Sequence, residues 1–160
     1  MHKPVQDLTA RQLAWAVAKA SCQLDKDRRL TGDTLLTGWW LWGPRQQYWI
    51  PLQEFDPCQN WGDAGPLIDQ EGILVGRSNG RLWKGDPGAF THAGQVLGGR
   101  EHGMRWVASL QPYEDLQAPM HFVFGPGPMW AAMRCLVRSK FGDVVDIPDE
   151  FASGESILAR

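Results

Sequence analysis

The chain has 160 residues, a length that suits one domain with a sizeable core, so we expect a single domain over 1–160. Its net charge of -2 argues against non-specific nucleic-acid binding, which needs a concentrated excess of Lys and Arg. No apolar run approaches the ~20 residues of a membrane span, and the first residues lack a signal-peptide pattern. We therefore expect a cytoplasmic protein with no membrane partner.

The cysteine and tryptophan content further limits the kinds of site that this chain can form. Cys22, Cys58 and Cys135 are odd in number and far apart, so they predict free thiols and no metal site. No Ser, His or Cys stands in a context typical of catalysis, and no cofactor is indicated. The nine tryptophans are the unusual feature, because this side chain is favoured both in cores and at binding surfaces.

The first predicted element is a helix that begins after Thr9. Residues 9–12 have the spacing of a capping box, in which Thr9 and Gln12 satisfy each other's backbone amides. Apolar residues at helical spacing then predict one buried stripe: Leu13, Ala16, Val17, Ala20 and Leu24. Trp15 projects from nearly the opposite side, so either the helix is covered on both sides or Trp15 is exposed to a partner.

The next segments predict a loop and a hairpin. Residues 25–29 are densely charged and indicate a solvated loop. Residues 35–42 and 47–52 are rich in aromatic and β-branched side chains around a turn at 43–46, which favours a hairpin. The weak alternation of 35–42 leaves a helix or loop open there. Four tryptophans lie in these segments: Trp39, Trp40, Trp42 and Trp49.

The middle of the chain predicts a short helix and a second hairpin. Residues 56–65 are dense in turn formers, Pro66 suits the start of a helix, and Gly72 suits its end. Asn79-Gly80 is a strong hairpin signal, so 73–75 and 81–84 predict paired strands. The glycine-rich stretch at about 85–103 indicates a long mobile loop.

The last third contains the best-specified helix. Alternating segments 104–110 and 120–124 predict strands before it. Pro128 suits the first helical position and Gly142 a left-handed cap. Between them one buried stripe is predicted: Met129, Ala132, Met133, Leu136 and Val137. Residues 143–148 then predict an extended piece, followed by a short helical turn and a loose tail at about 152–160.

These elements together predict an α+β fold. We expect a mainly antiparallel sheet of four to six strands, packed by the N-terminal helix and by the helix after Pro128. The sequence before that helix, Gly125-Pro126-Gly127-Pro128, predicts a rigid strand-to-helix corner. A phosphate-binding loop is disfavoured because the two prolines remove backbone amides.

Parts of the chain resemble the NinX-like family of tailed-phage proteins. The resemblance lies in residues 60–73, in Phe124-Gly125-Pro126-Gly127-Pro128 and in the segments that follow it as far as Glu150. Residues 13–18 are similar to the family's first helix, and Gly127 stands where members often carry Thr. The match covers roughly half of the chain. Because the family has no assigned reaction or cofactor, it implies only a phage or prophage origin and an accessory role in the infected cell.

Two groups of residues are candidate ligand contacts. Trp130, Arg134 and Arg138 recur every four residues, so a planar or phosphorylated ligand could stack on the ring and pair with the arginines. The alternative is a surface cation–π contact between Arg134 and Trp130. Trp61 and Asp63 could form a pocket rim, or else a tryptophan over a helix start beside a solvated acidic face.

The function predicted from these residues is non-enzymatic binding by a phage or prophage accessory protein. One hypothesis is a nucleotide-like small molecule, such as a host defence signal that the protein sequesters, held by the candidate ligand contacts. The other is a host protein, bound through exposed aromatic residues: Trp15, Trp39, Trp40 and Trp42. An uncharacterised enzyme is the third hypothesis.

Overall fold

The computed structural model describes residues 1–30, 32, 34–43, 48–77, 106–110 and 121–152. Its helices are α1 (Ala10–Ser21), α2 (Trp61–Glu71) and α4 (Pro128–Phe141). One sheet pairs β1 (His2–Pro4) with β8 (Val144–Asp146). A second has the order β2 (Gln23–Arg29), β3 (Leu35–Trp42) and β4 (Ile50–Pro51). The third has the order β5 (Leu74–Arg77), β6 (Trp106–Leu110) and β7 (His121–Gly125).

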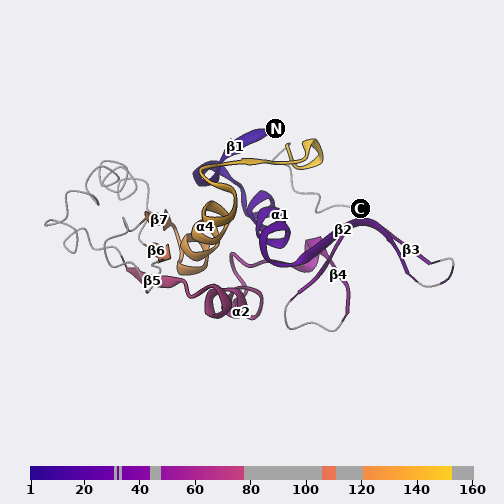
Figure 1. Cartoon of the computed structure of the whole chain (residues 1–160), viewed down its shortest axis with the longest axis horizontal. Helices are drawn as coiled ribbons and strands as arrows, with labels where there is room; N and C mark the ends of the chain where they lie inside the picture. Colours follow the sequence, from indigo (N-terminus) through magenta and orange to yellow (C-terminus); the bar gives the residue numbers. More distant parts are fainter. Residues whose placement is uncertain (31, 33, 44–47, 78–105, 111–120, 153–160) are drawn as a thin grey trace, which may run out of the picture.

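The predicted α+β class is confirmed, but the predicted single sheet of four to six strands is wrong. The strands of the described residues pair antiparallel in three small sheets, set around the helices (Figure 1). Helix α4 lies between α1 and the β5–β6–β7 sheet and contacts both. A helix therefore occupies the middle of the fold, and the strands around it form separate sheets.

Helix α4 begins at Pro128 and ends before Gly142, as predicted. Gly142 has φ 85° and ψ -162°, so its φ is positive but the residue lies outside the left-handed region expected for the cap. The helix is buried on more sides than the predicted stripe, because α1, α2 and a sheet surround it. Its buried residues are Met129, Ala131, Ala132, Met133, Arg134, Cys135, Leu136 and Val137.

Helix α1 starts at the predicted capping box. The Gln12 amide donates to Thr9 Oγ1 at 3.4 Å, and the Thr9 amide donates to Gln12 Oε1 at 3.0 Å. Every residue from Gln12 to Ala18 is buried, so this helix is covered on both sides. Trp15 is 3% exposed and packs against the rings of Trp39 and Phe151 at centroid distances of 6.0 and 6.2 Å. The prediction of Trp15 as an exposed partner contact is therefore wrong.

The charged segment 25–29 forms most of strand β2, and the predicted loop is wrong. Strand β2 pairs with β3, with one irregularity between Lys26 and Arg28, where Asp27 has φ 51°. The positive ends of Lys26 and Arg28 lie over the rings of Trp39 and Trp49, at 5.6 and 3.9 Å from the centroids. Long basic side chains cover aromatic surface here in place of apolar residues, which is why the sequence lacks a strand pattern.

The predicted hairpin of 35–42 with 47–52 is confirmed by the pairs Trp40–Pro51 and Leu41–Ile50. Helix α2 begins at Trp61, five residues before the predicted start, because the Asn60 side chain accepts from the Gly62 amide at 2.8 Å and caps it. It ends at Gly72 in the left-handed conformation, as predicted.

The extended piece expected at 143–148 is present as β8, and its partner β1 was not anticipated. Strand β5 is present and pairs with β6. The hairpin partner predicted at 81–84, the loop at 85–103 and residues 153–160 of the tail lie outside the described residues. In the described part of the chain, no helix is long and apolar enough to cross a bilayer.

Candidate functional site

Arg134, the central residue of the predicted ligand face, is an internal structural residue. It is 6% exposed, with Nη1 donating to the Phe124 carbonyl at 2.8 Å and Nη2 to the Gln6 carbonyl at 3.0 Å. Its guanidinium carbon also lies 5.2 Å from the centroid of the half-buried Trp130 ring. Burial lowers the pKa of Arg134. The expected cation–π pair is present, but inside the protein, where it ties α4 to β7 and to the N-terminal segment.

Arg138, one turn further along α4, has a different environment. Its Nε lies 2.5 Å from Asp143 Oδ1, just beyond the end of the helix. It lines a pocket to which neither Trp130 nor Arg134 contributes. The structure therefore does not bring the three predicted ligand residues together.

Trp61 and Asp63 lie at the start of α2 and outside this pocket. The Trp61 side chain is exposed, and Asp63 Oδ2 accepts from the Asp56 amide at 3.0 Å. Burial is the main cause that raises the pKa of Asp63. Both residues thus belong to the first turn of α2, and Asp63 stabilises the preceding turn through the Asp56 amide.

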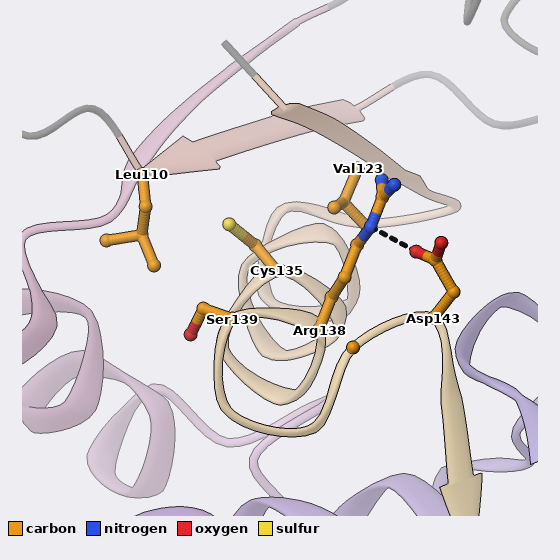
Figure 2. Close-up of a pocket in the computed structure, with 7 residues that line it drawn as sticks. Leu110, Val123, Cys135, Arg138, Ser139 and Asp143 are labelled. Carbon is orange, nitrogen blue, oxygen red and sulfur yellow. Dashed lines mark ion pairs between the residues drawn. The ribbon is translucent and has the colours of Figure 1, made fainter. Parts of the chain in front are cut away.

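The pocket has a volume of about 380 Å³ and lies between the C-terminal half of α4, the end of β6 and the middle of β7 (Figure 2). Figure 2 shows Cys135 and Arg138 reaching from the helix toward the strands, with Asp143 directed at Arg138. Gly142 turns the chain so that Asp143 can make this contact. The lining residues are Leu110, Val123, Cys135, Arg138, Ser139, Gly142 and Asp143.

The chemistry of the pocket suits binding. Leu110 and Val123 are apolar, whereas Arg138 and Asp143 form a charged pair on one side. Ser139 Oγ donates to the Leu136 carbonyl at 2.7 Å, so its lone pairs can still accept from a ligand. Burial raises the pKa of the Cys135 thiol to about 11, which keeps it protonated and weakly nucleophilic at neutral pH.

Outside the pocket, the described residues include the other two cysteines and further possible metal ligands. Burial also raises the pKa of Cys22 to about 11 and of Cys58 to about 12. The described residues contain no group of His, Cys, Asp and Glu side chains placed to hold a metal ion.

The predicted tryptophan cluster is divided between the two faces of the β2–β3–β4 sheet. Trp39 faces inward, packs on Trp15, and donates from Nε1 to Glu150 Oε1 at 2.5 Å. Trp40 and Trp42 alternate with it and therefore lie on the opposite face. Trp42 contacts Trp49 edge to face at 5.7 Å. We call Trp40, Trp42 and Trp49, all partly exposed, the outer aromatic face.

Most pocket residues were not predicted as site residues, and Arg138 is the exception. The missed residues with polar chemistry are Cys135, Ser139 and Asp143. The sequence contained a signal for the position of Asp143, because Gly142 marks the end of the helix and Asp143 follows it directly. An acidic residue directly after a chain reversal can contact the last turn of the helix.

No protein-family model matches the chain, and no curated protein matches it significantly.

Proposed function

We propose that this protein is a non-enzymatic binding protein that holds a small molecule in the pocket between α4, β6 and β7. The observation that carries the proposal is a pocket of about 380 Å³ in which apolar walls meet the Arg138–Asp143 pair. Small-molecule sites are typically concave, mostly apolar and provided with a few polar groups that orient the ligand.

The proposed setting is the cytoplasm of a host cell, with the protein acting as a phage or prophage accessory protein. This part rests on the resemblance of residues 60–73 and 124–150 to the NinX-like family. The ligand would be a nucleotide-like host molecule, such as a defence signal that the protein sequesters. Of the residues predicted to bind it, Arg138 is the one that lines the pocket.

The proposal is tested by mass spectrometry of small molecules released from the protein after purification from cells that produce it. Ser139 lines the pocket but is itself exposed, so Ser139→Trp should obstruct the pocket without disturbing the core. Ser139→Ala is the matched control. We expect a molecule to be released from the wild type and from the alanine variant, and to be missing from the tryptophan variant. Release of the same molecule from all three proteins would contradict the assignment to this pocket.

A second candidate function is binding of a host protein through the outer aromatic face. It is favoured by the placement of Trp40 and Trp42 opposite the core-facing Trp39, and by the exposure of Tyr48, which precedes Trp49 in sequence. Aromatic side chains often dominate the energy of protein interfaces.

This second candidate is tested with a partner captured by the wild type. Trp42→Ala should weaken the complex about tenfold or more, as for a central interface aromatic. Trp61→Ala, which removes an exposed tryptophan on α2, should leave it unchanged. Equal binding by both variants would exclude the outer aromatic face.

A further inference from the structure

We propose that the pocket recognises an uncharged heterocycle with a lactam edge, such as the guanine base of a nucleotide-like molecule, and does not itself bind phosphate. This inference rests on the proposed small-molecule function and specifies its ligand class. It follows from the geometry of the Arg138–Asp143 pair, from the charge at the pocket and from its apolar walls.

The first step is the set of hydrogen-bonding groups that the ion pair leaves available. The contact joins Arg138 Nε to Asp143 Oδ1 at 2.5 Å. The ion pair engages Arg138 Nε and Asp143 Oδ1, so the two terminal nitrogens of Arg138 and Asp143 Oδ2 lie outside this contact. The Asp143 side chain is 74% exposed and that of Arg138 is 21% exposed, so a ligand can reach the pair. The pair therefore presents donors beside an acceptor.

The second step concerns the net charge at the pocket. The positive charge of Arg138 is neutralised by Asp143, so the pair carries no net charge. The pocket also lies at the C-terminal half of α4, where the helix dipole is negative. Both features disfavour a phosphate, which is usually bound by unpaired cations or by helix N-termini.

The third step is the shape of the complementary ligand. In guanine, the O6 acceptor lies next to N–H donors on the same edge, so Arg138 could donate to O6 while Asp143 accepts from the ring and amino groups. Adenine reverses this order and would place its N1 acceptor against the carboxylate. Leu110, which is partly exposed, supplies apolar surface for the rest of the ring. The same pair would accept other lactams with this arrangement.

The experiment is titration calorimetry of the full chain with guanosine, adenosine and inorganic phosphate. We expect guanosine to bind at least about tenfold more tightly than adenosine, and phosphate to show no binding, because a site built for hydrogen bonds rejects a mismatched edge. Asp143→Asn should reduce the guanosine affinity about tenfold while changing adenosine binding little. Lys140→Met is the matched control, because Lys140 pairs with Glu71 outside the pocket.

The outcomes separate this inference from the proposed function. Equal affinity for the two nucleosides, binding of phosphate, or no binding of guanosine would overturn the lactam assignment. If Ser139→Trp still abolished release of a co-purified molecule, the pocket would remain a ligand site of another class. Circular dichroism of Asp143→Asn shows whether the variant is folded, and Arg138→Lys provides a second test, because it keeps the charge but loses the planar donor edge.

Discussion

Arg134 and Arg138 lie one turn apart on α4, yet they have different roles. Arg134 donates to two backbone carbonyls in the interior, whereas Arg138 pairs with an exposed carboxylate at a pocket. A buried hydrogen-bonded charge cannot be removed without leaving its partners unsatisfied. Substitution of Arg134 should therefore lower stability, whereas substitution of Arg138 should mainly affect ligand binding.

We predict that Arg134→Met lowers the free energy of unfolding by about 2–4 kcal/mol, because the carbonyls of Phe124 and Gln6 lose their donors. Arg138→Met should cost less than about 1 kcal/mol, since its ion pair is partly exposed. Urea unfolding of both variants measures the difference. Equal losses would show that Arg134 is not the internal tether described above.

Substitution of Gly142 should destabilise the protein because of its backbone conformation alone. An added Cβ would meet nothing within 4 Å, but φ 85° is rarely adopted by other residues. We predict that Gly142→Ala lowers stability by about 1–3 kcal/mol. Gly76→Ala in β5 is the control, because Gly76 also has open space and sits within a strand without a positive φ. It should raise stability by about 0.5–1 kcal/mol. Thermal unfolding of the two variants tests this opposite response.

At the scale of elements, the corner between β7 and α4 depends on close backbone approach. A Cβ on Gly125 would lie 2.6 Å from the Ala131 amide nitrogen and 3.0 Å from the Trp130 carbonyl carbon. A Cβ on Gly127 would meet Trp130 Cδ1 at an ordinary 3.7 Å. The two glycines of this corner therefore have unequal tolerance, even though the sequence presents them alike.

We predict that Gly125→Ala destabilises the protein by about 1–3 kcal/mol, because helix α4 must shift to relieve the overlap. Gly127→Thr should be tolerated and should add a few tenths of a kcal/mol. Gly127 has extended N-cap geometry, in which a threonine hydroxyl can accept from the first turn. Urea midpoints of both variants provide the measurement, and a stable Gly125→Ala protein would contradict the close approach.

The edge strand β2 is the element that the sequence pattern misrepresented. Its polar side chains are typical of an edge, where charges discourage pairing with another chain. Asp27 also accepts from the Gly38 amide at 2.7 Å, which stabilises the irregular position in the ladder. Charge density alone therefore cannot distinguish a loop from a protected edge strand.

At the scale of the whole molecule, residues near the C-terminus connect segments that are distant in sequence. The Gln12 side chain donates to the Phe151 carbonyl at 2.7 Å, and the Phe151 ring packs against Trp15 and Trp39. Glu150 accepts from Lys26 Nζ at 3.0 Å and from the Trp39 indole at 2.5 Å. The 149–151 turn thus joins α1 to the β2–β3–β4 sheet.

This junction predicts an acid-dependent loss of stability. Hydrogen bonds from Lys26 and then Trp39 lower the pKa of Glu150 below its ordinary 4.5. A lowered folded-state pKa contributes stability that is present above pH 4.5 and is lost as the pH falls through the folded value. We expect wild-type stability to fall more steeply with acidity than that of Glu150→Gln. The effect should be small because the group is partly exposed, and urea unfolding between pH 6 and pH 3 measures it.

The matched comparison uses Lys26→Met, which removes the first cause of the shift. In that background, Glu150→Gln should change the pH dependence less than it does in the wild type. An identical effect in both backgrounds would mean that Lys26 does not set the titration of Glu150.

The sequence by itself determined the start of α1, both ends of α4, the end of α2 and the α+β class. The signals at Thr9, Gln12, Pro128 and Gly142 are local, since each depends on a few neighbouring backbone groups. The stripe on α4 also predicted its core face correctly. Such local features do not depend on how the helix packs in the folded protein.

Only the tertiary structure decided which side chains are enclosed and which meet at a pocket. Trp15, Arg134 and the Arg138–Asp143 pair acquire their roles from segments that fold over them or turn back toward them. The division of the strands into three sheets was likewise decided by pairing between segments of the folded chain. The physical reason is that burial and pairing are set by partners distant in sequence, which local spacing does not encode.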